Sequence, residues 1–221
     1  MINKSTLKFL KDLSANNNRE WFAQHKTAYE AAKADAEHLA TQLAAGIAQF
    51  DKSIGYLEPK DCMFRIYRDT RFSHDKVPYK TNLGVVLQRG GKKTQFACYY
   101  VHIEPGNLFL SGGIYMPSPE ALKALRQAID VNFEEFEKII KNKTFGKYFD
   151  LEGDSKLNRV PQGFDKESPA AEYLKWKSWY VTSSITATEI CSSDFVVQTL
   201  QKFKALHPLV KFFNEAIEDI A

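Results

Sequence analysis

The chain has 221 residues, of which 44% are hydrophobic and 13% aromatic, enough apolar material for one large core or two small ones. Its formal net charge of +3 is too small to indicate nucleic-acid binding by itself. No apolar run reaches the length of a membrane-spanning helix, so we expect no membrane partner. The composition favours an ordinary globular protein over the membrane, fibrous and disordered classes.

The cysteine usage and the first residues bear on the compartment. The three cysteines, Cys62, Cys98 and Cys191, lie far apart, and none has a neighbour at metal-finger spacing. The first 18 residues lack the apolar stretch of a secretory signal. We therefore expect a cytoplasmic protein without disulfides, cofactor or structural metal.

The first 50 residues have the spacing of helices. Leu7, Leu10 and Leu13 predict a short helix that begins near Ser5 or Thr6. Three asparagines at 16–18 interrupt this pattern. From position 21 to position 50, apolar residues recur at steps of three and four, which predicts one long helix of about thirty residues.

From Lys60 onward the period changes to that of strands. Turn sequences at 89–92 and 104–107 separate apolar runs and predict an antiparallel meander. The third run is apolar on both faces, which indicates a central strand covered by helices on at least one side. The predicted strands are 62–67, 83–88, 94–103 and 108–115.

The C-terminal half returns to helices, with one more strand. Ser118 and Pro119 predict a helix start, and a second start is indicated at Asp130 or Asn132. Residues 143–167 read as a long irregular loop. We expect one α+β domain in which a long N-terminal helix and C-terminal helices pack a mostly antiparallel sheet of four to six strands. The remaining predicted elements are a short helix at 169–175, a strand at 178–185, a helix after Ser192 or Ser193 and a last helix opened by Pro208.

Residues 65–82 are the segment densest in polar functional groups, with five Lys or Arg and two Asp. Arginine matches phosphate and carboxylate oxygens two at a time, so this segment predicts a site for a phosphorylated or other anionic small molecule. Tyr79 would offer a hydroxyl or a stacking face, and Asp69 would orient an arginine. The predicted ligand-binding residues are Arg65, Arg68, Arg71, Lys76, Tyr79 and Lys80.

Two alternatives use the same segment differently. A nucleic-acid-binding module would extend the basic face over 65–93, through Arg89, Lys92 and Lys93, and its binding would weaken steeply with salt. A structural or interaction protein would use the segment as an ion-pair scaffold, and replacing Arg68 by alanine would then unfold it. The sequence leaves all three readings open.

Catalytic roles have weaker support. Asp69, Asp75 and His74 are the candidates for acid–base chemistry at a bound anion, and the two aspartates could carry Mg²⁺ beside a phosphate. Consecutive residues at 73–75 cannot form a triad, because neighbours in sequence do not face one another. No phosphate-binding glycine loop, dinucleotide fingerprint, paired-histidine zinc motif or nucleophile elbow is present.

One long pattern carries a resemblance to a known family. The order Arg65-x-x-Arg68-Asp69-x-Arg71-Phe72-Ser73-x-Asp75-Lys76-x-Pro78-Tyr79-Lys80 resembles the signature of domain of unknown function 2461, a mainly bacterial family. The likeness runs nearly the full length of the chain. It implies a stand-alone cytoplasmic protein of about this size and supplies no reaction, ligand or catalytic residue. Further matching stretches are 17–22, His25-Lys26, Tyr29, 113–117, Leu125-Arg126, Ile129, 161–164 and 175–180.

Overall fold

The computed structural model of the chain describes residues 1–69, 71, 76–218 and 220. Within these residues the strands form a five-stranded antiparallel sheet in the order β1-β2-β3-β5-β4. The first three strands are a meander, and β5 then pairs with both β3 and the edge strand β4. The strands are β1 (Leu83–Gln88), β2 (Cys98–Ile103), β3 (Phe109–Ile114), β4 (Asp150–Asp154) and β5 (Ser178–Ser184).

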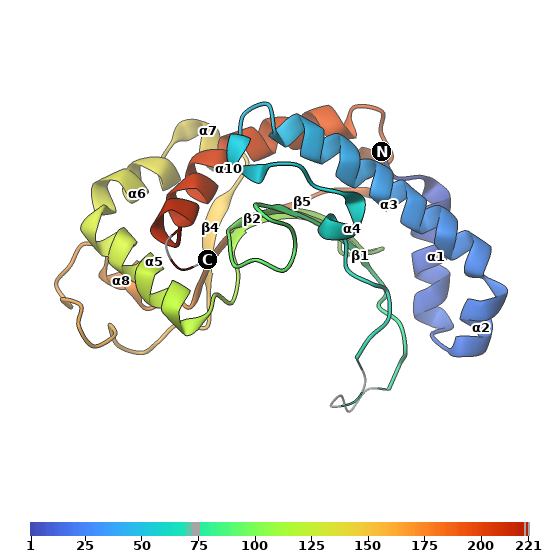
Figure 1. Cartoon of the computed structure of the whole chain (residues 1–221), viewed down its shortest axis with the longest axis horizontal. Coiled ribbons are helices and arrows are strands. Elements are labelled where there is room, and N and C mark those ends of the chain that lie inside the picture. Colours follow the sequence, from blue (N-terminus) through green and yellow to red (C-terminus); the bar gives the residue numbers. More distant parts are fainter. Residues whose placement is uncertain (70, 72–75, 219, 221) are drawn as a thin grey trace.

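Two long helices, α3 (Lys26–Ile47) and α10 (Phe195–Ala216), lie over one face of the sheet (Figure 1). Figure 1 shows an arch, in which helices α1 and α2 descend at one end and helices α5, α6 and α8 at the other. The sheet lies under the top of the arch. The remaining helices are α1 (Lys4–Ala15), α2 (Arg19–Gln24), α4 (Pro59–Cys62), α5 (Pro119–Val131), α6 (Phe133–Ile140), α7 (Lys143–Gly146), α8 (Ala171–Leu174) and α9 (Ala187–Ile190), with a 3₁₀ turn at Lys52–Ile54.

The core lies between the sheet and the two long helices. Side chains alternate across a strand, so one face of β2 presents Tyr99, Val101 and Ile103, each at most 1% exposed. The positions between them are only partly buried and lie on the opposite face, which we call the open face. Among the described helices none is drawn over that face in Figure 1. The predicted α+β architecture with its antiparallel sheet is confirmed.

The single helix predicted over 21–50 is wrong. Helix α2 ends at Gln24 and α3 begins at Lys26, with His25 between them. The His25 ring stacks on Trp21, and its Nδ1 lies 2.8 Å from the Trp21 carbonyl oxygen. A side chain that hydrogen-bonds a backbone group of the preceding turn competes with helix continuation. Both helices keep the same buried stripe, so spacing could not reveal the break.

Three further expectations differ from the structure. Residues 62–67 make only isolated bridges, Met63 with Val85 and Tyr67 with Tyr79, and no strand. The expected loop 143–167 contains α7 and the edge strand β4. Helix α10 runs through Pro208, because the fully buried Leu206 and Leu209 hold the helix against the sheet.

A polar network beside this core is centred on one buried carboxylate, Asp51. Asp51, which is 4% exposed, accepts hydrogen bonds from Tyr99 Oη at 2.9 Å and from Ser53 Oγ at 2.6 Å. His207 Nδ1 lies 3.5 Å from the same carboxylate. Burial opposes ionisation of Asp51, but the hydrogen bonds from His207, Ser53 and Tyr99 outweigh it and lower its pKa to about 2.

This lowered pKa predicts a stability that depends on pH. The folded-state pKa lies below the unfolded value, so Asp51 contributes its stability above the unfolded pKa and loses it as the pH falls toward about 2. We expect Asp51→Asn to be clearly less stable than the wild type near neutral pH. Urea unfolding should show that the difference in the free energy of unfolding between the two proteins is about 2 kcal/mol smaller near pH 2 than near neutral pH. A difference in stability that stays the same from neutral pH to about pH 2 would contradict the lowered pKa of Asp51.

Candidate functional site

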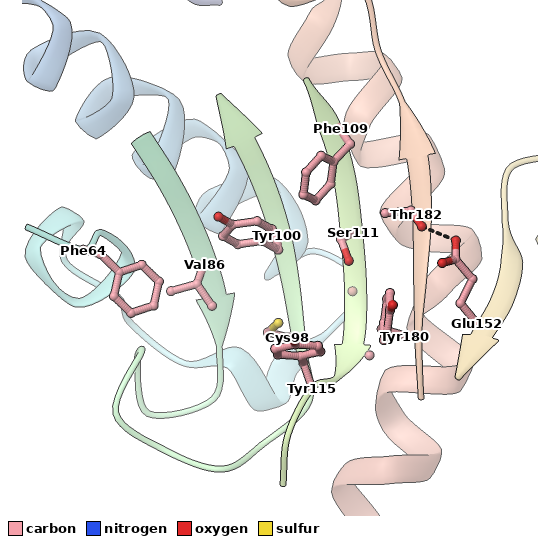
Figure 2. A pocket seen from close by; sticks show the side chains of 12 residues that line it. Phe64, Val86, Cys98, Tyr100, Phe109, Ser111, Tyr115, Glu152, Tyr180 and Thr182 are labelled. Carbon is pink, nitrogen blue, oxygen red and sulfur yellow. Dashed lines mark hydrogen bonds between the residues drawn. The ribbon is translucent and has the colours of Figure 1, made fainter. Parts of the chain in front are cut away.

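A cleft of about 550 Å³ lies on the open face of the sheet. Its walls come from β1, β2, β3 and β5, from β4 at one edge and from the segment before β1 at the other (Figure 2). A cleft of this size with mostly apolar walls and a few polar groups has the character of a small-molecule site. It is lined by Phe64, Val86, Cys98, Tyr100, Phe109, Ser111, Gly112, Gly113, Tyr115, Glu152, Tyr180 and Thr182.

Strand register explains the shape of the cleft. Tyr100 pairs with Ser111, and Gly113 pairs with Tyr180, so the middle strand presents its smallest side chains between large rings. Gly113 has φ +109°, and a Cβ there would lie 2.4 Å from the Trp179 carbonyl oxygen. Only glycine fits this position. The floor of the cleft is therefore low and its rim is aromatic.

The chemistry of the rim is set by hydroxyl groups more than by charge. Tyr180 and Tyr115 meet edge to face, with ring centroids 5.6 Å apart. Burial raises the pKa of the Cys98 thiol to about 12, so this lining residue stays a thiol at neutral pH and is a poor nucleophile. Glu152 brings a carboxylate to this mostly uncharged lining, and it accepts a hydrogen bond from Thr182.

We call residues 64–82 the basic arm. Its described residues lie beside the open face, in the segment that leads into β1 (Figure 1). The two limbs of the arm pair near its root, where Arg68 N donates to Pro78 O at 2.9 Å and Lys80 N donates to Ile66 O at 2.8 Å. Tyr79 is 6% exposed and stacks on Phe22 of α2, with ring centroids 3.9 Å apart. This packing fixes the root of the arm against the N-terminal helices.

The predicted ligand-binding residues separate into two groups along the arm. Lys80 Nζ lies 5.3 Å from the ring centroid of Phe64, which lines the cleft, so the root of the arm borders the site. Burial and the nearby Arg65 guanidinium lower the pKa of Lys80. Arg71, farther out, is exposed and makes a bidentate pair with Asp69, at 2.9 and 2.6 Å.

Arg68, Lys76 and Tyr79 are not among the residues that line the cleft. Arg68 is partly exposed and Lys76 is exposed, and both make further interactions within the chain. The packing of Tyr79 leaves little of its ring open to a ligand. The acid–base candidates His74 and Asp75 lie outside the described residues. The expected Asp69–Asp75 magnesium pair is therefore described only at Asp69.

The hydrogen bonds from Arg71 lower the pKa of Asp69, so this carboxylate is ionised and engaged with the guanidinium.

Across the part of the chain that the structure describes, no group of three His, Cys, Asp or Glu side chains could hold a metal ion. In that same part no helix has both the length and the apolar character needed to cross a membrane.

The extended basic face considered for nucleic acid is divided by β1. The arm enters this strand at Leu83, whereas Arg89 and Lys92 follow its far end, roughly 20 Å away for six residues. Arg89 pairs with Glu218 at 2.8 Å, and Lys92 donates to the Lys60 carbonyl oxygen. Arg89 and Lys92 therefore lie at the opposite end of β1 from the arm.

Sequence reasoning missed a row of three polar side chains on the open face. Tyr100 Oη lies 3.0 Å from His102 Nδ1, and His102 Nε2 lies 3.2 Å from Glu104 Oε2. The signal was available, because Tyr-x-His-x-Glu at every second position places the three side chains on one face of a strand. The expectation that 94–103 is apolar on both faces concealed it.

A comparison with family models places the chain in one family. The family model for a conserved hypothetical protein, DUF2461, matches residues 5–212. No curated protein and no solved structure matches the chain. The match covers both the basic arm and all five strands that build the cleft. The chain therefore belongs to the DUF2461 family.

Proposed function

We propose that the chain binds a small molecule that has a flat apolar body and an anionic group. The body would lie in the cleft, on the low floor at Ser111 and Gly113 and between the rings of its rim. The anionic group would lie at the root of the basic arm, on Lys80 and Arg65. The contact of Lys80 with Phe64 carries this proposal, because it joins the most basic segment of the chain to the cleft.

Electrostatics support one orientation of such a ligand. A lysine whose pKa is lowered by burial and by a neighbouring cation gains from an added negative charge. The opposite edge of the sheet, β4, carries Asp150, Glu152 and Asp154 at alternate positions, and Glu152 lines the cleft. An anion is repelled from that edge and attracted to the arm. The ligand would therefore lie across the strands, with its charge toward β1.

Replacing Lys80 by methionine tests this proposal. Methionine keeps an unbranched apolar stem over Phe64 and removes the charge. We expect phenyl phosphate and phenylpyruvate to bind the variant about tenfold or more weakly, because a hydrogen bond to a charged group contributes about 1.5–3 kcal/mol. Phenol, which has the ring without the charge, should bind both proteins equally. Calorimetry or ligand-induced thermal shift gives the dissociation constants.

Lys147→Met is the matched control, because Lys147 Nζ makes the same kind of contact with Tyr148, at 5.0 Å, in the segment after α7. It should leave binding unchanged. Ser111→Leu, which fills the floor, should weaken phenol and phenyl phosphate together. Anion binding that is equal in wild type and Lys80→Met would overturn the proposal. Tight, strongly salt-dependent binding of short single-stranded DNA, unaffected by Ser111→Leu, would favour the nucleic-acid module instead.

A further inference from the structure

The Tyr100, His102 and Glu104 side chains form a continuous chain of hydrogen bonds that ends at the cleft. His102 lies between the other two, within 3.0 Å of Tyr100 Oη and 3.2 Å of Glu104 Oε2. The His102 ring stacks on Phe109, with centroids 4.6 Å apart and planes at 12°, which fixes its orientation. Tyr100 is the member of the row that lines the cleft.

The carboxylate end of the row determines the direction of the hydrogen bonds. Thr81 Oγ1 donates to Glu104 Oε1 at 2.6 Å, and Asn107 Nδ2 lies 3.5 Å from Oε2. Burial opposes ionisation, but the hydrogen bonds from Thr81, His102 and Asn107 lower the pKa of Glu104. An ionised carboxylate only accepts, so His102 Nε2 carries the proton that it donates to Glu104.

This tautomer determines what the tyrosine does. With the proton on Nε2, Nδ1 of the neutral imidazole is an acceptor, and the Tyr100 hydroxyl must donate to it. The lone pairs of Tyr100 Oη are then left for a ligand in the cleft. Burial raises the pKa of Tyr100 to about 12, so the hydroxyl keeps its proton until a partner takes it.

The backbone around the tyrosine makes room for this arrangement. Gly84 of β1 pairs with His102, and a Cβ at Gly84 would lie 2.6 Å from Tyr100 Oη. A glycine inside a strand weakens that strand, and it often marks a close approach of another group. Here the absent side chain leaves space for the tyrosine hydroxyl.

We propose that Tyr100, His102 and Glu104 are a proton relay and that the cleft is the active site of an enzyme that removes a proton from carbon in its anionic ligand. The inference rests on the proposed function, since the ligand must occupy the same cleft. The row has the order of a nucleophile–histidine–carboxylate triad, with a tyrosine in the first place. Tyr100 is the catalytic residue, and His102 and Glu104 are positioning residues.

The proton transfer balances without a co-reactant. Tyr100 Oη takes a proton from a carbon next to a carbonyl, while its own proton passes to His102 Nδ1. The electron pair of the C–H bond becomes the C=C bond of an enolate, and the negative charge moves to the carbonyl oxygen. The imidazolium that forms is paired with Glu104. Return of the proton to the same or a neighbouring carbon completes an exchange or an isomerisation.

Deuterium incorporation tests the relay with a defined probe. Phenylpyruvate has an aromatic ring, a carboxylate and an acidic methylene group. In D₂O, NMR should show wild-type protein exchanging the methylene protons at least about a hundredfold faster than Tyr100→Phe, the size of effect expected for general-base catalysis. Tyr100→Phe should still bind phenylpyruvate, as a thermal shift would show. Glu104→Gln should slow exchange without abolishing binding.

A second measurement addresses the relay in the ligand-free protein. Long-range ¹H–¹⁵N NMR of His102 should show the proton on Nε2 in the wild type and a changed tautomer balance in Glu104→Gln. A proton on Nδ1 in the wild type would overturn the relay. Binding of phenylpyruvate without faster exchange than in Tyr100→Phe would overturn the relay alone. If phenol, phenyl phosphate and phenylpyruvate all fail to bind, the proposed function is overturned, and the relay fails with it.

Discussion

Gly113→Ala is expected to lower the free energy of unfolding by about 3–5 kcal/mol. Two costs add at this position. The backbone has φ +109°, a conformation that side-chain-bearing residues rarely adopt. The new Cβ would also lie 2.4 Å from Trp179 O and 2.9 Å from the Cα of Tyr180, both on the neighbouring strand β5. Chemical unfolding should show the loss, and the melting temperature should fall by roughly 10 °C.

Gly163→Ala separates the two costs. Gly163 has φ +92°, close to that of Gly113, but nothing lies within 4 Å of its Cβ position. The Gly163→Ala variant should therefore lose only the cost of backbone strain, about 1–2 kcal/mol of the free energy of unfolding. The two variants together measure what the close approach of β3 and β5 contributes. Equal losses would show that β5 moves away from β3 easily and that the floor of the cleft is not rigid.

The strands that the sequence predicts well are those with a covered face. The predicted strands 83–88 and 108–115 match β1 and β3 within two residues. An apolar run bounded by turn sequences indicates a strand whatever element covers it. The edge strand β4 was missed, since Asp-Leu-Glu-Gly-Asp has neither apolar alternation nor strand propensity. Backbone pairing with β5 alone makes it a strand, and pairing is invisible to local spacing.

The same limit applies to the candidate site. The basic arm is contiguous in sequence, so its composition indicates a site before any fold is known. The cleft is assembled from positions such as Ser111, Gly113 and Tyr180, which meet only through the register of different strands. No local pattern predicts that register. Sequence reasoning therefore found the border of the cleft at Lys80 and missed its floor.

The junction between the arm and the N-terminal helices depends on one asparagine. Asn17 Nδ2 donates to Tyr79 O at 2.9 Å, and Asn17 Oδ1 accepts from Tyr79 N at 3.1 Å. A single side chain thus satisfies both backbone groups of a buried residue, as a partner strand would. Lys80 follows directly, so the same clamp fixes the backbone of the cation that borders the cleft.

We expect Asn17→Ala to lower the free energy of unfolding by about 2 kcal/mol, because two backbone groups lose their partners. The amide of Tyr79 should exchange with deuterium much faster, whereas amides within α3 should be unchanged. Asn16→Ala is the matched control, since Asn16 Nδ2 bonds only the Asp12 carbonyl oxygen at an exposed helix end. It should change neither quantity appreciably.

Ligand affinity gives the clamp a functional readout. If Lys80 recognises the anionic group of the ligand, releasing the root of the arm should weaken phenyl phosphate binding and leave phenol binding unaltered, because phenol needs only the cleft. The weakening should be smaller than in Lys80→Met, since the charge remains and only its position is lost. Faster amide exchange at Tyr79 with unchanged phenyl phosphate binding would show that the ligand does not depend on the arm, and would remove Lys80 from the site.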